Sequence, residues 1–441
     1  LDDGNDMLPK SCIVWLNDLC LAAFNTRGGW AAMALARTNL ADLGNLSLYG
    51  SYRTAGFGNL EEKLTALELV NTLQLQSTLD LELGKFLPED WGMRIPFYLD
   101  YNKQIGSPEY NPLDPDVKLA DDLRTYQTKE ERDSIRLMTQ ERKTTTNITL
   151  TNIRKERVGK ASLKPHFYDI ENFSLSYAYS RERSSDDEIH HYNKDQHRGS
   201  IAYAYTPRDP GLFAPFASTK SKLINNKNLK LIKDFNLYYK PKNVTFTTEI
   251  FRDYEETLLR NKGAALVIIK PTYFKQFTWK REYGLQYDLS RSIHLQYNAT
   301  ANARIDEPVG SIDATGTSDS IWNSFTRGGT MQNFQQTFNI QWDLPINKLP
   351  YLDFLRIPLT YRTAYNFMGT TQALAAQGSV LNSNTQFQAT ATASMQTLYN
   401  KVKLFKNAQA RKTPPPQKKD PKRMTNRERQ QYAQDSLARA K

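Results

Sequence analysis

The chain has 441 residues, enough for a large core or for several domains. Only 39% of them are hydrophobic, and no apolar run approaches the roughly eighteen residues that a helical membrane span needs. The net charge of +11 lies almost wholly in residues 401–441, which hold 13 Lys/Arg and 3 Asp/Glu, so it says little about the partners of the first 400 residues.

Residues 1–29 are expected to form an N-terminal extramembrane segment that contains both cysteines. On a continuous strand, Cys12 and Cys20 would lie roughly 26 Å apart, too far for a disulfide. A turn between them would change that distance, so a bridge stays open, with locally packed free thiols as the default. The first residues, Leu1-Asp2, are neither an initiator methionine nor a signal peptide, which indicates a fragment or a processed product.

The residues after 70 show the clearest strand pattern of the chain. Apolar side chains fall on one parity and polar ones on the other, over a length that exceeds an ordinary sandwich strand but suits a tilted strand across a bilayer. The same alternation recurs in "FSLSYAYS" and "FNIQWDL". The side chains predicted to face lipid are Leu73, Leu75, Leu79, Leu81, Leu83, Phe173, Leu175, Tyr177, Ile340 and Trp342. Those predicted to face an aqueous lumen are Gln74, Gln76, Asp80, Glu82, Asn339, Gln341 and Asp343.

About fourteen such segments are predicted, and they indicate an all-β chain: a transmembrane antiparallel β-barrel segment of a larger barrel. They lie near 30–38, 44–54, 70–86, 93–106, 144–156, 167–182, 198–208, 233–241, 243–260, 273–288, 292–306, 332–345, 355–368 and 384–400. Barrel strands are thus expected over 30–106 and 144–409, with long loops at 183–197, 209–232 and 307–331. Two consecutive long links break the expected alternation of tight and long links, so either a strand is missed there or one long link lies on the tight-turn side.

Two segments differ from the strands in composition. Residues 107–143 begin with a proline-rich turn and continue with opposite charges at helical spacing, which predicts a helical extramembrane insert on a rim. Residues 410–441 contain three consecutive prolines and almost no apolar side chains, which predicts a basic, disordered extramembrane tail. A solvated linker is the simplest interpretation, with anionic lipid as an alternative. Nucleic acid is not expected as a partner, because no aromatic interleaving or folded module accompanies the charge.

No motif indicates an enzyme, a cofactor or a metal site. The run "DDEIHHYNKDQH" contains possible ligands, but adjacent histidines on a strand point in opposite directions and the spacing matches no closed site, so a hydrophilic rim loop is expected. Asp80 and Glu82 lie about 7 Å apart on one strand face, a separation that resembles glycosidase carboxylates. A polar lumen wall explains the same pair without catalysis.

Six strings in chain order carry a family resemblance: "LPKSCIVWLNDL" (8–19), "GGWAAMALARTNLADLG" (28–44), "AGFGNLEEK" (55–63), "YNPLDPDV" (110–117), "DQHRGSIAYAYTP" (195–207) and "NARIDEPVGSID" (302–313). Together they resemble the SprA/Sov family, the giant outer-membrane translocons of the Bacteroidetes type IX secretion system. The resemblance implies a partial chain of a very large barrel in the bacterial outer membrane that exports folded proteins and serves gliding motility. It also implies, as partners, secreted protein cargo, outer-membrane lipids, a plug protein and a PorV-type shuttle barrel.

Two other classes of protein remain as alternatives. One is another outer-membrane barrel such as a nutrient receptor, although neither a plug domain nor an energy-coupling box is visible. The other is a soluble β-rich adhesin or structural protein, whose sheets would pack against protein on both faces. The environment of the two strand faces therefore distinguishes the hypotheses.

Overall fold

The computed structural model of the chain describes residues 28–58, 68–158, 165–217, 230–262, 268–312, 317–349, 352–370, 376 and 378–401. Most of the N-terminal segment 1–29, with Cys12 and Cys20, and the whole tail 410–441 therefore lie outside the described residues.

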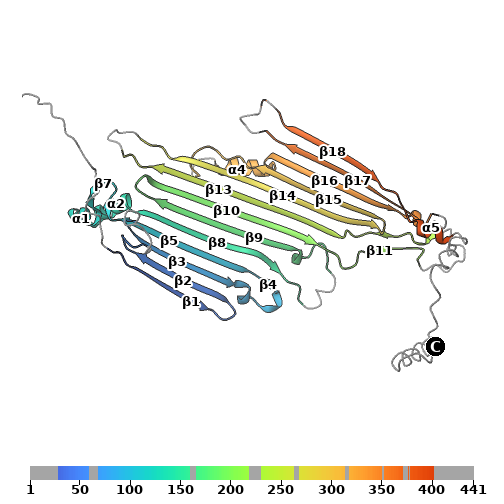
Figure 1. The fold of residues 1–441 in the computed structure, drawn as a ribbon, viewed down its shortest axis with the longest axis horizontal. Helices are drawn as coiled ribbons and strands as arrows, with labels where there is room; N and C mark the ends of the chain where they lie inside the picture. Colours follow the sequence, from blue (N-terminus) through green and yellow to red (C-terminus); the bar gives the residue numbers. More distant parts are fainter. Residues whose placement is uncertain are drawn as a thin grey trace, which may run out of the picture.

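One antiparallel sheet of 15 strands makes up most of the described structure (Figure 1). Its strands follow the order of the chain, because each long strand turns back and pairs with the next. The long strands are β1 (Ala31–Asn39), β2 (Gly44–Arg53), β3 (Val70–Glu82), β5 (Pro96–Pro108), β8 (Glu141–Lys155), β9 (Phe173–Ser185), β10 (Ile189–Tyr205), β13 (Asn243–Leu259), β14 (Thr272–Ser290), β15 (Ile293–Arg304), β16 (Thr330–Leu344), β17 (Leu355–Met368) and β18 (Val380–Ala389). β4 (Met93–Arg94) pairs with β8, and β19 (Thr392–Ala393) with β17.

The remaining elements lie in the links between the long strands. Two two-stranded sheets consist of β6 (Tyr110–Asn111) with β7 (Asp114–Lys118), and of β11 (Leu212–Phe213) with β12 (Leu237–Tyr238). The helices are α1 (Leu119–Thr125), α2 (Lys129–Thr139), α3 (Lys230–Lys233), α4 (Thr317–Thr326) and α5 (Met395–Lys401), with short 3₁₀ turns at Leu83–Phe86, Glu89–Trp91, Ile170–Asn172 and Pro345–Lys348. α2 begins with a capping box, in which Thr128 and Glu131 satisfy each other's backbone N–H groups.

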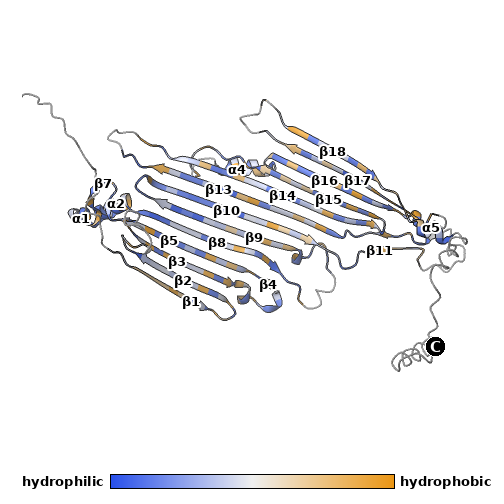
Figure 2. Ribbon diagram, viewed as in Figure 1, coloured by the Kyte–Doolittle hydropathy of each residue, from blue (hydrophilic) through white to orange (hydrophobic). Residues whose placement is uncertain are grey.

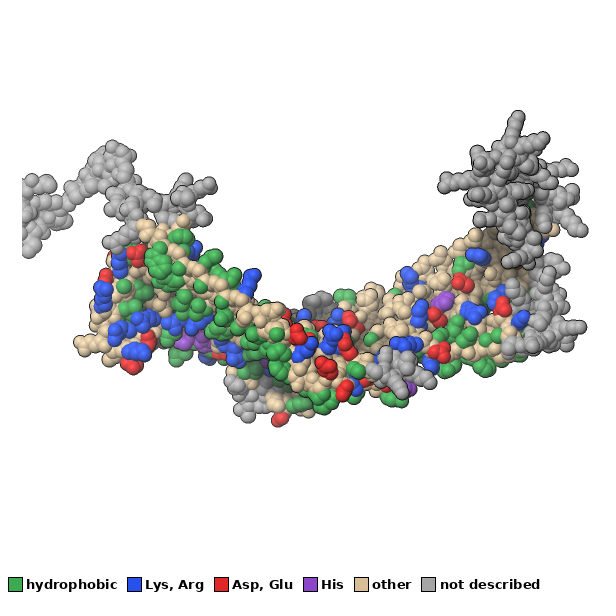
Figure 3. Space-filling model, turned by 90° about the horizontal axis from the view of Figure 1, so that it is seen from below, with side chains coloured by type: hydrophobic (Ala, Val, Ile, Leu, Met, Phe, Trp, Pro, Cys, Tyr) green, Lys and Arg blue, Asp and Glu red, His purple; other side chains and the backbone are tan. Residues whose placement is uncertain are grey.

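The sheet is a single curved layer. The space-filling view from below shows a thin body that is hollowed on its upper side (Figure 3). Few apolar residues of the described part are buried, and only Ile305 is less than 2% exposed among the larger side chains. A two-layer sandwich is therefore not what these residues form. Within the described part the sheet is open, with β1 and β18 at its two ends.

The region expected as a long loop at 183–197 is instead a hairpin of two long strands. Only residues 186–188 separate β9 from β10, and the Asp186 carboxylate accepts hydrogen bonds from Glu188 N and Ile189 N at 2.8 and 2.6 Å. The loop prediction was wrong because the charged residues of this region form ion pairs across the strands, as Lys194 does with Glu255 at 2.5 Å. The long link between β10 and β13 then lies at the same sheet edge as the tight β14–β15 turn, which settles the choice that the sequence left open.

Three further boundaries differ from prediction. Leu83 lies beyond β3, because the chain turns at Gly84, where a Cβ atom would come within 2.2 Å of Met93 O. The strand expected over 384–400 ends at Ala389, and α5 follows after the short β19. The strand expected over 233–241 is a two-residue pairing, β12, that follows α3.

Candidate functional site

The strand register divides the side chains of the sheet between two faces. Residues directly opposite each other on neighbouring strands project to the same face. Leu79 of β3 lies opposite Leu46 of β2 and Leu99 of β5, so three leucines from three strands are adjacent. We name the face that carries Leu79 the apolar face and the opposite one the polar face. Alternating hydropathy colours along each strand follow this division (Figure 2).

The register extends this assignment across the whole sheet. The predicted lipid-facing residues of β3, β9 and β16 all fall on the apolar face, although these strands are far apart in the chain. The register that connects them runs β3–β5–β8–β9–β10–β13–β14–β15–β16. The members of the set on this face are Leu73, Leu75, Leu79, Leu81, Phe173, Leu175, Tyr177, Ile340 and Trp342. Leu83, in the 3₁₀ turn, is the exception.

The polar face carries the predicted lumen residues Gln74, Gln76, Asp80, Glu82, Asn339, Gln341 and Asp343. A chain of hydrogen bonds crosses four strands on it. Gln76 Nε2 donates to Asp100 Oδ1 at 3.1 Å, and Asn147 Nδ2 donates to Asp100 Oδ2 at 3.2 Å. Ser180 Oγ then donates to Asn147 Oδ1 at 2.7 Å. Glu82 serves the turn after β3, because its Oε1 accepts from Ile95 N at 2.6 Å. Glu82, one of the two carboxylates whose spacing resembles a glycosidase pair, is thus bonded to a backbone N–H group of the turn.

The apolar face is not apolar along its whole length. Toward the edge of the sheet that carries the β9–β10 turn, it holds a group of charged and polar side chains centred on Asp195. This carboxylate accepts from Tyr179 OH at 2.9 Å, from Arg181 Nε at 2.9 Å and from Arg183 Nη2 at 2.6 Å. We name these four residues the Asp195 cluster. A hydrocarbon environment would penalise such charges heavily, so only the part of this face beyond the cluster suits lipid.

That remaining part of the face forms an apolar band. We define it by side chains that lie between the Asp195 cluster and the edge of the sheet with the β14–β15 turn. On the central strands its apolar members are Phe173, Leu175, Tyr177, Ile201, Tyr203, Phe246, Ile250, Tyr283, Leu285, Leu295, Phe338, Ile340 and Trp342. Arg281 of β14 is a charged exception within these limits, and its Nη2 donates to Gly328 O at 3.2 Å. Many of the apolar members are exposed, among them Leu175 at 44% and Trp342 at 41%. The sequence shows the alternation of this band but not where it ends, because residues of the Asp195 cluster follow the same period of two.

The link between β15 and β16 crosses the apolar face next to the Asp195 cluster. We name residues 305–312 and 317–329 the strap. The Glu307 carboxylate, whose side chain is 4% exposed, accepts from Arg252 Nε and Nη2 at 2.7 and 3.0 Å. Lys275 Nζ donates to Pro308 O at 2.9 Å, and the Phe325 ring of α4 stacks on Trp279 with centroids 4.6 Å apart.

Most of the buried apolar residues of the described part lie at this crossing: Tyr254, Ala299, Ala301, Ala303 and Ile305. The small alanine side chains leave room for the strap to lie close to β15. A loop was predicted over 307–331, but its helix and its attachment to the sheet were not, because both depend on contacts with β13 and β14.

The histidine-rich region also departs from expectation. His190 and His191 were expected to point in opposite directions, but the pairing of β10 with β13 is irregular between Ile189 and His191. Their Nδ1 atoms therefore lie 3.0 Å apart, and His191 Nε2 is 3.2 Å from Glu256 Oε1. Nowhere in the described ranges do three or more His, Cys, Asp or Glu side chains gather in a way that could hold a metal ion.

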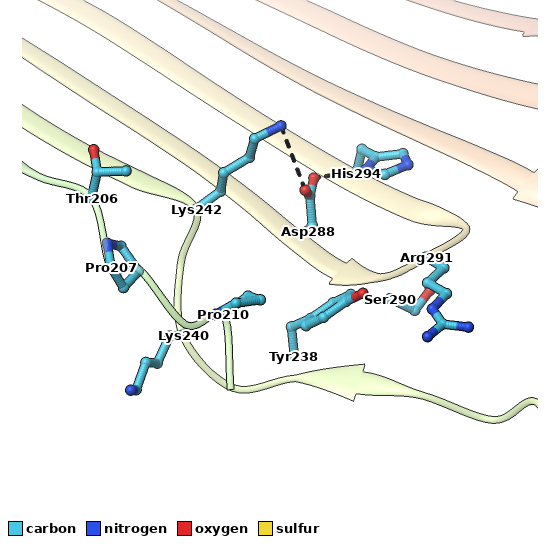
Figure 4. A pocket seen from close by; sticks show the side chains of 10 residues that line it. All are labelled: Thr206, Pro207, Pro210, Tyr238, Lys240, Lys242, Asp288, Ser290, Arg291 and His294. Atoms are coloured by element: carbon cyan, nitrogen blue, oxygen red, sulfur yellow. Dashed lines mark hydrogen bonds and ion pairs between the residues drawn. The ribbon is translucent and has the colours of Figure 1, made fainter. Parts of the chain in front are cut away.

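A pocket of about 440 Å³ lies at the edge with the β14–β15 turn, between that turn and the link before β13 (Figure 4). The Asp288 carboxylate lies among basic side chains of the pocket: its Oδ1 is 2.6 Å from His294 Nδ1, and its Oδ2 is 3.7 Å from Lys242 Nζ. Lys240 and Arg291 point away from this carboxylate (Figure 4). The basic side chains thus do not converge on one point, and the pocket has no evident set of ligand donors.

The register and the two faces define a class of protein: a single-layered antiparallel sheet with an apolar band on one face and a continuous polar surface on the other. None of the helices in the described part is both long and apolar enough to cross a membrane. The family model SprA_N, described as motility related/secretion protein, matches residues 2–123. The match supports membership of the SprA/Sov family and confirms the resemblance that the sequence indicates. No curated protein matches the chain. The match over these residues indicates a motility- or secretion-related function.

Proposed function

We propose that this sheet forms part of the wall of a protein-conducting channel in the bacterial outer membrane. The channel would export folded proteins through the type IX secretion system. The observation that carries the proposal is the segregation of side chains across nine consecutive long strands. A lipid-facing surface needs uncharged apolar side chains, and a water-filled lumen needs a polar wall. The SprA_N match supports the link to secretion and motility.

The composition of the polar face suits the passage of varied cargo. Ser, Thr, Asn and Gln predominate on it, and its charges are paired in several places, as in Lys143–Glu182 at 2.7 Å and Lys194–Glu255 at 2.5 Å. Such a surface offers hydrogen bonds without a strong field of one sign, so it favours no single class of cargo. Passage of this kind requires no catalytic residue or cofactor, and we propose that the chain is not an enzyme.

By family resemblance, the proposed partners are secreted protein cargo, outer-membrane lipids, a plug protein and a PorV-type shuttle barrel. Two alternatives make different demands on the same sheet. A nutrient receptor would take small ligands on the polar face, and a soluble adhesin would bury the apolar band against protein.

Photo-crosslinking from neighbouring positions tests the proposal. A photoreactive amino acid is placed at Gln341, on the polar face, or at Ile340, next to it on the apolar face, in cells that secrete cargo. We expect secreted proteins to be crosslinked from position 341, whereas position 340 should yield only lipid adducts. Adducts to secreted proteins from neither position, or equally from both, would contradict the channel function.

A further inference from the structure

The strap presents an exposed aromatic side chain at the place where the apolar band ends. Trp322 of α4 is 63% exposed, and its ring stands edge-on to Phe325 with centroids 6.1 Å apart. Phe325 in turn stacks on Trp279 of β14. The helix is therefore attached to the sheet through Phe325, while most of the Trp322 side chain stays exposed.

The register fixes the position of α4 relative to the band. Trp279 lies opposite Ile250, in the last apolar row of β13. The next residue of β13 on this face is Arg252, which holds Glu307 of the strap and lies opposite His197, next to the Asp195 cluster. On β14 a charge lies one row further into the band: Arg281, on the same face, covers the Trp279 ring at 4.3 Å and donates to Gly328 O of the strap at 3.2 Å. α4 and the rest of the strap therefore lie where side chains that suit hydrocarbon give way to side chains that require water.

The composition of the helix matches that boundary. Besides Ile321, Trp322 and Phe325, its residues are small and polar, with one charge, Asp319, in the first turn, and Arg327 follows the helix directly. Amphipathic aromatic rings and arginines concentrate where a membrane-spanning surface meets the lipid headgroups, because the ring contacts acyl carbons while its N–H stays hydrated. If Trp322 faced bulk water here, its large apolar surface would stay hydrated, which is unfavourable compared with contact with lipid.

We propose that α4 is an interfacial helix that lies in the headgroup layer of the bilayer, with Trp322 inserted among the lipids. The inference rests on the proposed function, since it takes the apolar band to be the lipid-facing surface. It adds the depth of two strands in the membrane: the headgroup layer crosses β13 at Ile250 and β14 at Trp279, and the Asp195 cluster lies outside the hydrocarbon. The strap then fixes this depth, because Arg252–Glu307 and Trp279–Phe325 hold α4 in place.

Depth-dependent fluorescence quenching tests this placement. The full chain, with Cys12→Ser and Cys20→Ser, carries a single cysteine at position 322, 285 or 286, labelled with an environment-sensitive fluorophore. Leu285 and Gln286 are neighbours on the apolar and polar faces of β14. Each labelled protein is placed in phosphatidylcholine vesicles that are brominated near the headgroups or deep in the acyl chains.

We expect the label at 322 to lose most fluorescence with shallow bromines, the label at 285 with deep bromines, and the label at 286 with neither. If 285 is quenched but 322 is not, the interfacial placement of α4 is overturned while the wall assignment stands. If 285 also escapes quenching, the proposed function itself is refuted.

Discussion

A single arginine on the apolar face should prevent stable insertion of the sheet, and Leu79 is the most informative position for it. The positions around it on the same face, on β2 and β5, are uncharged: Leu46, Leu48, Phe97, Leu99 and Tyr101. An arginine in Leu79→Arg would thus find no counter-charge. Because strands are tilted in a bilayer, depth is judged along β3 itself, where the apolar face carries leucines from Leu73 to Leu81 and Leu79 lies within this run. An arginine at mid-depth on a lipid-facing strand costs about 2–4 kcal/mol. That cost corresponds to a shift of about 30- to 900-fold in the equilibrium between inserted and non-inserted chain.

The matched control is Thr78→Arg, one residue away. Thr78 lies on the polar face opposite Ser47 and Asp100, so the new guanidinium would meet water and a carboxylate. The assay is the fraction of chain that resists urea extraction from outer membranes of cells that produce each variant. We expect a large loss for Leu79→Arg and little change for Thr78→Arg. Equal losses for the two variants, or full retention of Leu79→Arg, would refute the assignment of the faces.

Three further predictions concern the strap and the polar face. Glu307→Gln should leave Arg252 without its buried counter-charge and destabilise the strap by about 3–5 kcal/mol. This loss is measured as faster amide exchange at residues 299–305. Adding Arg252→Met to the same chain should restore part of the lost stability, because no unpaired charge then remains. Burial raises the pKa of Asp306, but hydrogen bonds from Thr330 and Arg304 outweigh it and hold the pKa below the ordinary 3.8. The carboxylate therefore stabilises the strap above pH 3.8. The protection factor of the residue 306 amide, taken against the intrinsic exchange rate at each pH, should fall only as the pH falls through the lowered pKa. Asp100→Leu should lower the free energy of unfolding by about 1–3 kcal/mol, because Gln76 and Asn147 lose the acceptor of their hydrogen bonds. Asp100→Asn keeps an acceptor oxygen and should lower it less; chemical unfolding measures both.

Most of the strands could be predicted from the sequence, because their alternation is a local property. Successive side chains on an extended backbone project to opposite faces whatever they contact, so Leu79 and Asp80 are separated before any pairing forms. One error fell where polarity was taken as a sign of a loop. Residues 183–197 are rich in charge, yet they form β9 and β10, because Asp195 and Lys194 find their partners on neighbouring strands.

The sequence by itself determined that this chain forms long strands with one apolar and one polar side, and the family match covers four of the six strings that carried the resemblance. Only the tertiary structure decided where the apolar band ends, because that depends on which residues of different strands stand opposite one another. The strap shows the same limit: Glu307 and Arg252 are 55 residues apart, and nothing local to either predicts their contact. Backbone geometry acts between neighbours in the chain, whereas charge pairing and burial act between whatever the register brings together.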